Sequence, residues 1–126
     1  MQYKRPYASR TIEILEDYTV LCEENQPHCR DSSGTSQQGM LYHAFEDLVC
    51  VFGVHNAQPS ECSEVCWVIE TPSGIATIYD WKQGVAPEKC TEWTVGAKNQ
   101  EVVEYVHRAF HNFFEREGNQ NAGSIR

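Results

Sequence analysis

The segment from residue 66 to residue 81, CWVIETPSGIATIYDW, constrains the fold more than any other part of the chain. Two runs rich in β-branched and aromatic residues flank the sequence Pro72-Ser73-Gly74. Apolar runs separated by such turn residues are typical of a β-hairpin. The run EWTVG at residues 92–96 is predicted to form a third strand, which ends at Gly96. The centre of the chain therefore predicts an antiparallel sheet.

Two segments with helical periodicity lie on either side of these strands. In residues 40–53, MLYHAFEDLVCVFG, apolar residues recur every three or four positions, and Gly53 is placed to end a helix. Residues 99–117, NQEVVEYVHRAFHNFFERE, repeat apolar residues in the same way, and Gly118 is expected to end that helix. The pattern predicts an α+β fold with a small antiparallel sheet, a helix before it and a C-terminal helix packed on it.

The remaining segments are less regular. A chain of 126 residues suits a single domain spanning residues 1–126. Residues 11–22 fit a strand and a helix about equally well. The other segments are expected to be an N-terminal arm, two loops and a flexible tail, at residues 1–10, 23–39, 54–65 and 118–126.

The charge of the chain excludes some classes of partner. Its formal net charge is −8, whereas proteins that bind long nucleic acids or membrane surfaces present an excess of lysine and arginine. The chain has no run of 18 apolar residues, and MQYKRPYASR at its start lacks the apolar stretch of a signal peptide. We therefore expect a cytosolic protein with no membrane or long nucleic-acid partner.

The six cysteines, Cys22, Cys29, Cys50, Cys62, Cys66 and Cys90, are expected to be free thiols, because disulfides are rare in the cytosol. Cys62 and Cys66 have a spacing found in zinc sites. A second pair of ligands would have to come from Cys22, His28 and Cys29. This set is incomplete, so we predict no metal and no cofactor.

The four residues Tyr79, Asp80, Trp81 and Lys82 end the predicted hairpin. Because strand side chains alternate between two faces, Tyr79 and Trp81 are predicted to share one face, and Asp80 and Lys82 the other. Packing beneath a helix is the commoner use of such aromatic residues. The alternative is a platform on which a nucleotide base stacks, and Trp93 could share that face or a nearby one.

The last helix carries a polar stripe in which residues recur every three or four positions: Glu104, His107, Arg108, His111 and Glu115. Such a stripe is usually a solvated helix surface. One alternative is a metal site at His107, His111 and Glu104, and another is recognition of a phosphate or base by Arg108. No phosphate-binding glycine loop or nucleophile elbow is present. Catalytic residues are therefore not assigned, and we expect a protein that is not an enzyme.

Several motifs together resemble the Thoeris anti-defence sponges, a family of small phage proteins. The motifs are VFG at 51–53, WVIET from Trp67, GIATIYDWKQG at 74–84, EWTVG from Glu92 and the helix with Val102, Val106 and Arg108. These sponges hold the cyclic ADP-ribose isomer made by bacterial immune enzymes without cleaving it, and some also hold cyclic oligonucleotides. The resemblance implies that Trp81 stacks on adenine, that Arg108 meets the phosphates and that Thr91 contacts the ribose or base. Tyr79, Lys82 and Trp93 complete the expected site.

The resemblance leads to an expected function in immune evasion. The protein is expected to sequester a cyclic nucleotide signal in the host cytoplasm. Because so small a chain cannot enclose a nucleotide tightly by itself, we expect a homo-oligomer with its pocket at a subunit interface. Two alternatives remain open: an acidic inhibitor that covers a basic surface of a host defence protein, and a metal-dependent nucleotide hydrolase.

Overall fold

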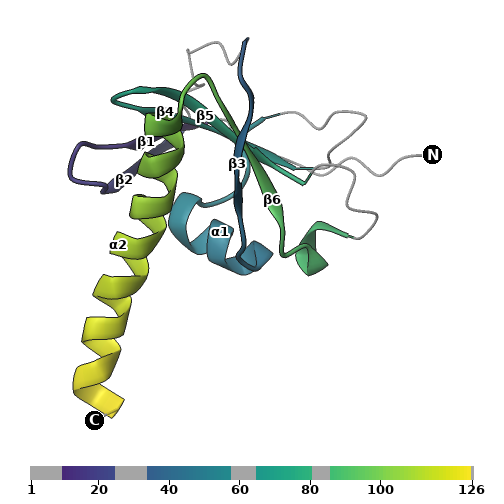
Figure 1. The fold of residues 1–126 in the computed structure, drawn as a ribbon. Coiled ribbons are helices and arrows are strands. Elements are labelled where there is room, and N and C mark those ends of the chain that lie inside the picture. Colours follow the sequence, from purple (N-terminus) through teal and green to yellow (C-terminus); the bar gives the residue numbers. More distant parts are fainter. Residues whose placement is uncertain (1–9, 25–33, 58–64, 81–85, 126) are drawn as a thin grey trace.

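The structure is a computed structural model that describes residues 10–24, 34–57, 65–80 and 86–125 (Figure 1). Six strands and two α-helices follow one another along the chain: β1 (Arg10–Ile14), β2 (Val20–Glu24), β3 (Ser36–Leu41), α1 (Phe45–Phe52), β4 (Cys66–Thr71), β5 (Gly74–Tyr79), β6 (Trp93–Ala97) and α2 (Gln100–Ile125). A short 3-10 helix, η1 (Pro87–Lys89), precedes β6. The predicted α+β class is confirmed.

The six strands form one sheet in the order β2-β1-β4-β5-β6-β3. Every neighbouring pair is antiparallel except β1 and β4, which are parallel. The predicted hairpin is β4–β5, in which Cys66 lies opposite Tyr79 and Thr71 opposite Gly74. The predicted third strand is β6, which pairs with β5. The central part of the sheet is therefore as the sequence indicates.

The structure decides one prediction that the sequence left open and differs from three others. Residues 11–22 belong to a hairpin, β1–β2, and not to a helix. The expected loop at 23–39 contains the edge strand β3, which lies along β6, and the helix predicted from residue 40 begins only at Phe45. The last helix continues past Gly118 to Ile125, so the predicted end at Gly118 is wrong. Pairing with the distant strand β6 explains why β3 is a strand, because strand formation depends strongly on context.

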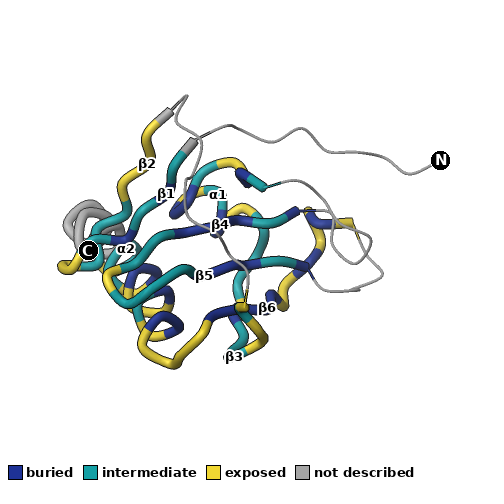
Figure 2. The backbone as a smooth tube through the Cα atoms, turned by 90° about the horizontal axis from the view of Figure 1, so that it is seen from above, coloured by how far each residue is buried: buried dark blue, intermediate teal, exposed yellow. Residues whose placement is uncertain are grey.

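The core lies between the sheet and the two helices. Figure 2 shows buried residues concentrated in β4, β5 and β6, whereas β2 is exposed. Alternate strand residues such as Trp67, Ile78 and Val95 share one buried cluster with Phe52 of α1 and Val106 of α2. Both helices therefore cover the sheet face that carries Trp67 and Ile78. The β1–β2 turn lies beside α2 (Figure 1).

Two buried indoles hold the ends of α1. The Trp93 Nε1–H donates to the His43 carbonyl (2.9 Å), just before the helix, and the Trp67 Nε1–H donates to the Gly53 carbonyl (2.8 Å), just after it. The two rings meet edge to face with centroids 5.5 Å apart. A helix of eight residues is marginal by itself. Its position is therefore set by tertiary packing on these tryptophans.

Candidate functional site

Among the residues that the structure describes, those expected to bind a nucleotide do not come together. Trp81 and Lys82 lie outside the described residues. Tyr79 lies opposite Thr94 in the sheet, so these two residues share one face and Trp93 points to the other. Trp93 is completely buried in the core. Its expected place in a ligand site is therefore wrong for this structure, because the ring is not open to a guest.

Tyr79 is a half-buried aromatic residue at the end of β5. Its ring extends across β6, since its Cε1 would be 3.6 Å from a Cβ added at Gly96. Burial, followed by the neighbouring Cys66 thiol, raises the pKa of the Tyr79 hydroxyl. Thr91 is exposed just before β6. Tyr79 and Thr91 are thus the accessible residues of the expected site at the end of the hairpin that the structure describes.

Asp80 is buried and is not a surface partner of the expected platform. Its Oδ1 accepts the Val65 N–H at 3.2 Å. Burial, and then the nearby Asp80 carboxylate, raises the pKa of the Cys66 thiol to about 12. A thiol with so high a pKa stays protonated at neutral pH and is a poor nucleophile. The four described cysteines, Cys22, Cys50, Cys66 and Cys90, are free thiols.

Arg108 lies on the other side of the molecule from the end of β5. Val102, at the start of α2, would be 3.3 Å from a Cβ at Gly74, which begins β5. Tyr79 is five residues further along, about 17 Å in an extended strand. Figure 1 shows the β1–β2 turn beside α2 and away from η1, which follows β5. The structure therefore does not bring Arg108 to Tyr79.

Arg108 instead belongs to a cluster that we call the tyrosine–arginine patch, formed by Tyr18, Tyr105 and Arg108. The Arg108 guanidinium carbon lies 5.5 Å from the centre of the Tyr18 ring, and Arg108 Nη1 is 3.5 Å from the Tyr18 hydroxyl. The Tyr18 and Tyr105 ring centroids are 5.4 Å apart. These distances are typical of cation–π and aromatic pairs. The patch joins the β1–β2 turn to the exposed side of α2.

The backbone at Tyr18 has an unusual conformation. Its φ of +68° lies in the left-handed region, and Tyr18 is the one residue other than glycine with positive φ among the described residues. The Tyr18 N–H donates to the Leu15 carbonyl and the Leu15 N–H to the Thr19 carbonyl, both at 2.8 Å. In such tight hairpin turns glycine usually occupies this position. A tyrosine here costs about 1 kcal/mol in backbone strain.

Carboxylates surround the tyrosine–arginine patch. On α2, Glu101, Glu104, Tyr105 and Arg108 follow the spacing of one helix face, and Glu104 Oε1 is 3.7 Å from Arg108 Nε. The exposed Glu16 and Asp17 lie in the turn beside Tyr18. Partial burial, then Tyr18 and then the carboxylates of Glu16, Glu101 and Glu104, raise the pKa of the Tyr105 phenol. The negative charge of these carboxylates disfavours the binding of a phosphate by Arg108.

The residues of the alternative metal site do not converge. Glu104 pairs with Arg108, and His111 Nε2 is 2.6 Å from Glu115 Oε2. His107 is exposed on α2. In the described part of the chain, no group of three histidine, cysteine or acidic side chains is placed to hold a metal ion. Cys29, Cys62 and His28 lie outside the described residues.

Comparison of the chain with protein-family models, with curated proteins and with solved structures gives no match. Within the described residues, no helix is both long and apolar enough to span a membrane. From the sequence, Arg108 is singled out as a contact for phosphate, but Tyr18 and Tyr105 are not. The spacing of Glu101, Glu104, Tyr105 and Arg108 was a usable signal for one face of the helix. No pattern in the sequence predicts that Tyr18 contacts this face of the helix.

Proposed function

We propose that the protein acts by binding, and that its tyrosine–arginine patch docks on a basic surface of a partner protein. The observation that carries this proposal is the left-handed backbone at Tyr18. A glycine would remove the strain, so the tyrosine ring has a use that compensates for it. The ring lies against Tyr105 and Arg108 on an open surface.

The composition of the patch suits a protein interface. Tyrosine and arginine are the residue types that most often dominate the energy of protein binding. Carboxylates at the rim of such a site attract a positively charged partner and speed its association. The net charge of −8 acts in the same direction. By the resemblance to phage anti-defence proteins, the partner would be a host defence protein in the cytoplasm, blocked by occupancy and not by catalysis.

Tyr18→Gly is expected to separate folding from binding. The free energy of unfolding should change by less than about 1 kcal/mol, because relief of backbone strain offsets the lost ring contacts. Peptides selected from a random display library on the immobilised wild-type protein should be rich in arginine and lysine. Their affinity should fall at least about tenfold for Tyr18→Gly and for Tyr105→Ala, as expected for a binding hot spot. Calorimetric titration measures the affinities, and urea denaturation measures stability.

Tyr42→Ala is the matched control for this experiment. Tyr42 is 67% exposed and lies outside the patch, just before α1. Its substitution should leave peptide affinity unchanged. The proposal is wrong if the selected peptides are not basic, or if they bind the Tyr18→Gly and Tyr105→Ala proteins as tightly as the wild type.

A second candidate function is sequestration of a cyclic nucleotide at the end of β5. The half-buried ring of Tyr79 and the exposed Thr91 favour it, since Tyr79 precedes Trp81 by two residues in the chain and Thr91 lies just before β6, the strand that pairs with β5. A base would stack on aromatic residues there, in a pocket completed by a second subunit of a homo-oligomer. The distant Arg108 has no part in this version of the site.

The nucleotide candidate predicts depletion of a signal without its hydrolysis. The protein is mixed with cyclic ADP-ribose isomers and cyclic oligonucleotides, the free fraction is measured by mass spectrometry, and the protein is then denatured by heat. Depletion followed by recovery of intact nucleotide is expected, with loss of depletion in Trp81→Ala and wild-type depletion in Arg108→Ala. A product of altered mass would indicate a hydrolase, and absence of depletion would reject this candidate.

A further inference from the structure

The tyrosine–arginine patch already holds one guanidinium, and the contacts of that group show how this surface binds a cation. The guanidinium carbon of Arg108 lies 5.5 Å from the centre of the Tyr18 ring, and Arg108 Nη1 is 3.5 Å from the Tyr18 hydroxyl. Arg108 Nε is 3.7 Å from Glu104 Oε1. An aromatic ring therefore lies against the cation, and a carboxylate one helical turn earlier on α2 offsets its charge.

A second pair of an aromatic ring and a carboxylate lies beside the first. Tyr105 and the exposed Glu101 are four residues apart on α2, as Arg108 and Glu104 are, so their side chains are neighbours on the helix surface. The Tyr105 ring is half-buried, and it lies 5.4 Å from the Tyr18 ring at an angle of 49°. Among the described residues, a guanidinium lies over the ring of Tyr18, but no cationic side chain lies over the ring of Tyr105.

The charge around the two rings favours a further cation. Arg108 is the one cation that belongs to the patch, and Glu104 already offsets its charge. More exposed carboxylates lie on the β1–β2 turn and the first turns of α2 than this one cation can neutralise: Glu16, Asp17, Glu101 and Glu104. A positively charged group of a partner is therefore attracted to Tyr105 and Glu101.

We infer that the patch recognises an arginine side chain of its partner, whose guanidinium stacks on Tyr105 and pairs with the Glu101 carboxylate. The inference rests on the proposed docking of a basic partner and names the side chain that is recognised. A planar guanidinium can stack on an aromatic face and donate two parallel hydrogen bonds to one carboxylate, whereas the lysine ammonium is a compact, strongly hydrated charge. Lysine in the same place would keep the charge but lose the stacking and the paired hydrogen bonds.

Two peptides of equal length and charge test this inference on the full chain. One is a capped peptide of alternating arginine and glycine, and the other is the same peptide with lysine in place of arginine. Each is titrated into the isotopically labelled protein, and the amide resonances are followed by NMR. The arginine peptide should bind about fivefold more tightly, with the largest shifts at residues 16–19 and 101–105.

Variants of the second pair identify the groups that give the preference. Tyr105→Leu keeps an apolar side chain against the core but removes the ring, so the two peptides should then bind about equally. Tyr105→Phe keeps the ring and should keep the preference. Glu101→Gln should weaken binding of the arginine peptide at least about threefold. Glu115→Gln, which removes the same charge from α2 outside the patch, is its matched control and should leave that affinity unchanged.

The possible results separate this inference from the proposed function. If both peptides shift the patch resonances and bind equally well, the arginine inference is overturned and the docking of a basic partner stands. A preference for arginine that persists in Tyr105→Leu also overturns the inference, because the ring would not be the group that stacks. If neither peptide shifts the resonances of the patch, the proposed docking surface is itself rejected, and the arginine inference is rejected with it.

Discussion

Trp93→Ala is expected to lower the free energy of unfolding by about 3–5 kcal/mol, the range seen when a large buried aromatic side chain is removed. Trp93 is completely buried, meets Trp67 edge to face at 5.5 Å and lies 6.2 Å from the ring of Phe45. The substitution leaves a cavity beneath α1 and removes the donor to the His43 carbonyl. Urea denaturation followed by circular dichroism measures the loss.

Trp93→Phe distinguishes packing from hydrogen bonding at this position. Phenylalanine keeps most of the aromatic contact but leaves the partly buried His43 carbonyl without its indole partner, at a cost of about 1 kcal/mol. We expect the free energy of unfolding of Trp93→Phe to lie between that of the wild type and that of Trp93→Ala. A loss below about 1 kcal/mol for Trp93→Ala would contradict the burial of the ring, because core truncations of this size cost more.

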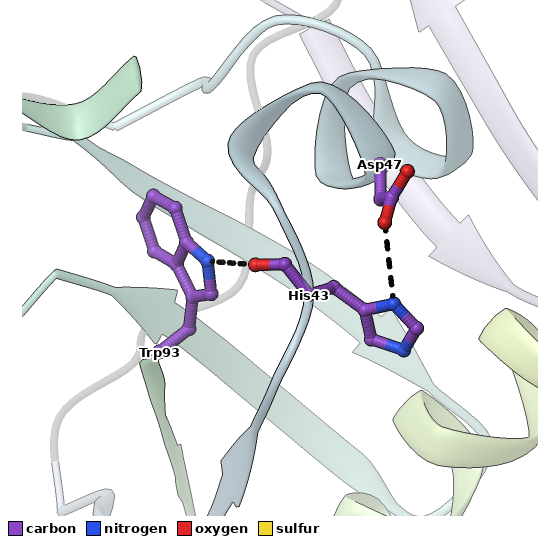
Figure 3. A network of polar contacts seen from close by, with 3 residues as sticks. All are labelled: His43, Asp47 and Trp93. Carbon is purple, nitrogen blue, oxygen red and sulfur yellow. Dashed lines mark hydrogen bonds and ion pairs between the residues drawn. The ribbon is translucent and has the colours of Figure 1, made fainter. Parts of the chain in front are cut away.

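The indole contacts also explain why α1 lies where it does. The sequence offers no side-chain cap at Ala44, and α1 has only eight residues. Trp93 and Trp67 bind the carbonyls just before and just after the helix. A change at Trp93 therefore acts directly on His43 (Figure 3), whose ring stacks on Phe110 of α2.

The sequence predicted the elements whose signals are local. The β4–β5 hairpin has both of its strands and its turn within residues 66–79, and α2 has a long apolar repeat. The edge strand β3 has neither a neighbouring strand partner in the sequence nor an apolar repeat, since Ser36–Leu41 has the sequence SQQGML. It is a strand because it pairs with β6, more than fifty residues away in the chain. Such pairing is a property of the folded sheet and not of the local segment.

The candidate site shows the same limit. The positive φ of Tyr18 cannot be read from a tyrosine, because tyrosine rarely adopts it. The contact of Tyr18 with Tyr105 depends on how α2 crosses the sheet. Trp93 was misassigned because a strand pattern gives alternation but not register, and a shift of one residue exchanges the two faces. The pairing of Tyr79 with Thr94 settles which face Trp93 occupies.

Gly96→Ala is expected to destabilise the protein by about 1–3 kcal/mol, as overpacking in a core does. Gly96 lies opposite Thr77 in the pairing of β5 with β6, and a Cβ at Gly96 would overlap Thr77 Oγ1. Both residues are buried at the centre of the sheet, so Thr77 has little room to move away. Gly96→Val should destabilise the protein more than Gly96→Ala, because the two methyl groups of valine extend the overlap toward Tyr79.

A double-mutant cycle tests this explanation. Thr77→Ala removes the hydroxyl that the new methyl group meets, so Gly96→Ala should cost much less in the Thr77→Ala background than in the wild type. Thr94→Ala is the control, since Thr94 is equally buried and lies two residues from Gly96 on the same strand, but is not its cross-strand partner. Denaturant midpoints of the single and double variants give the coupling energy. Equal costs of Gly96→Ala in the wild-type and Thr77→Ala backgrounds would show that the glycine is required for another reason.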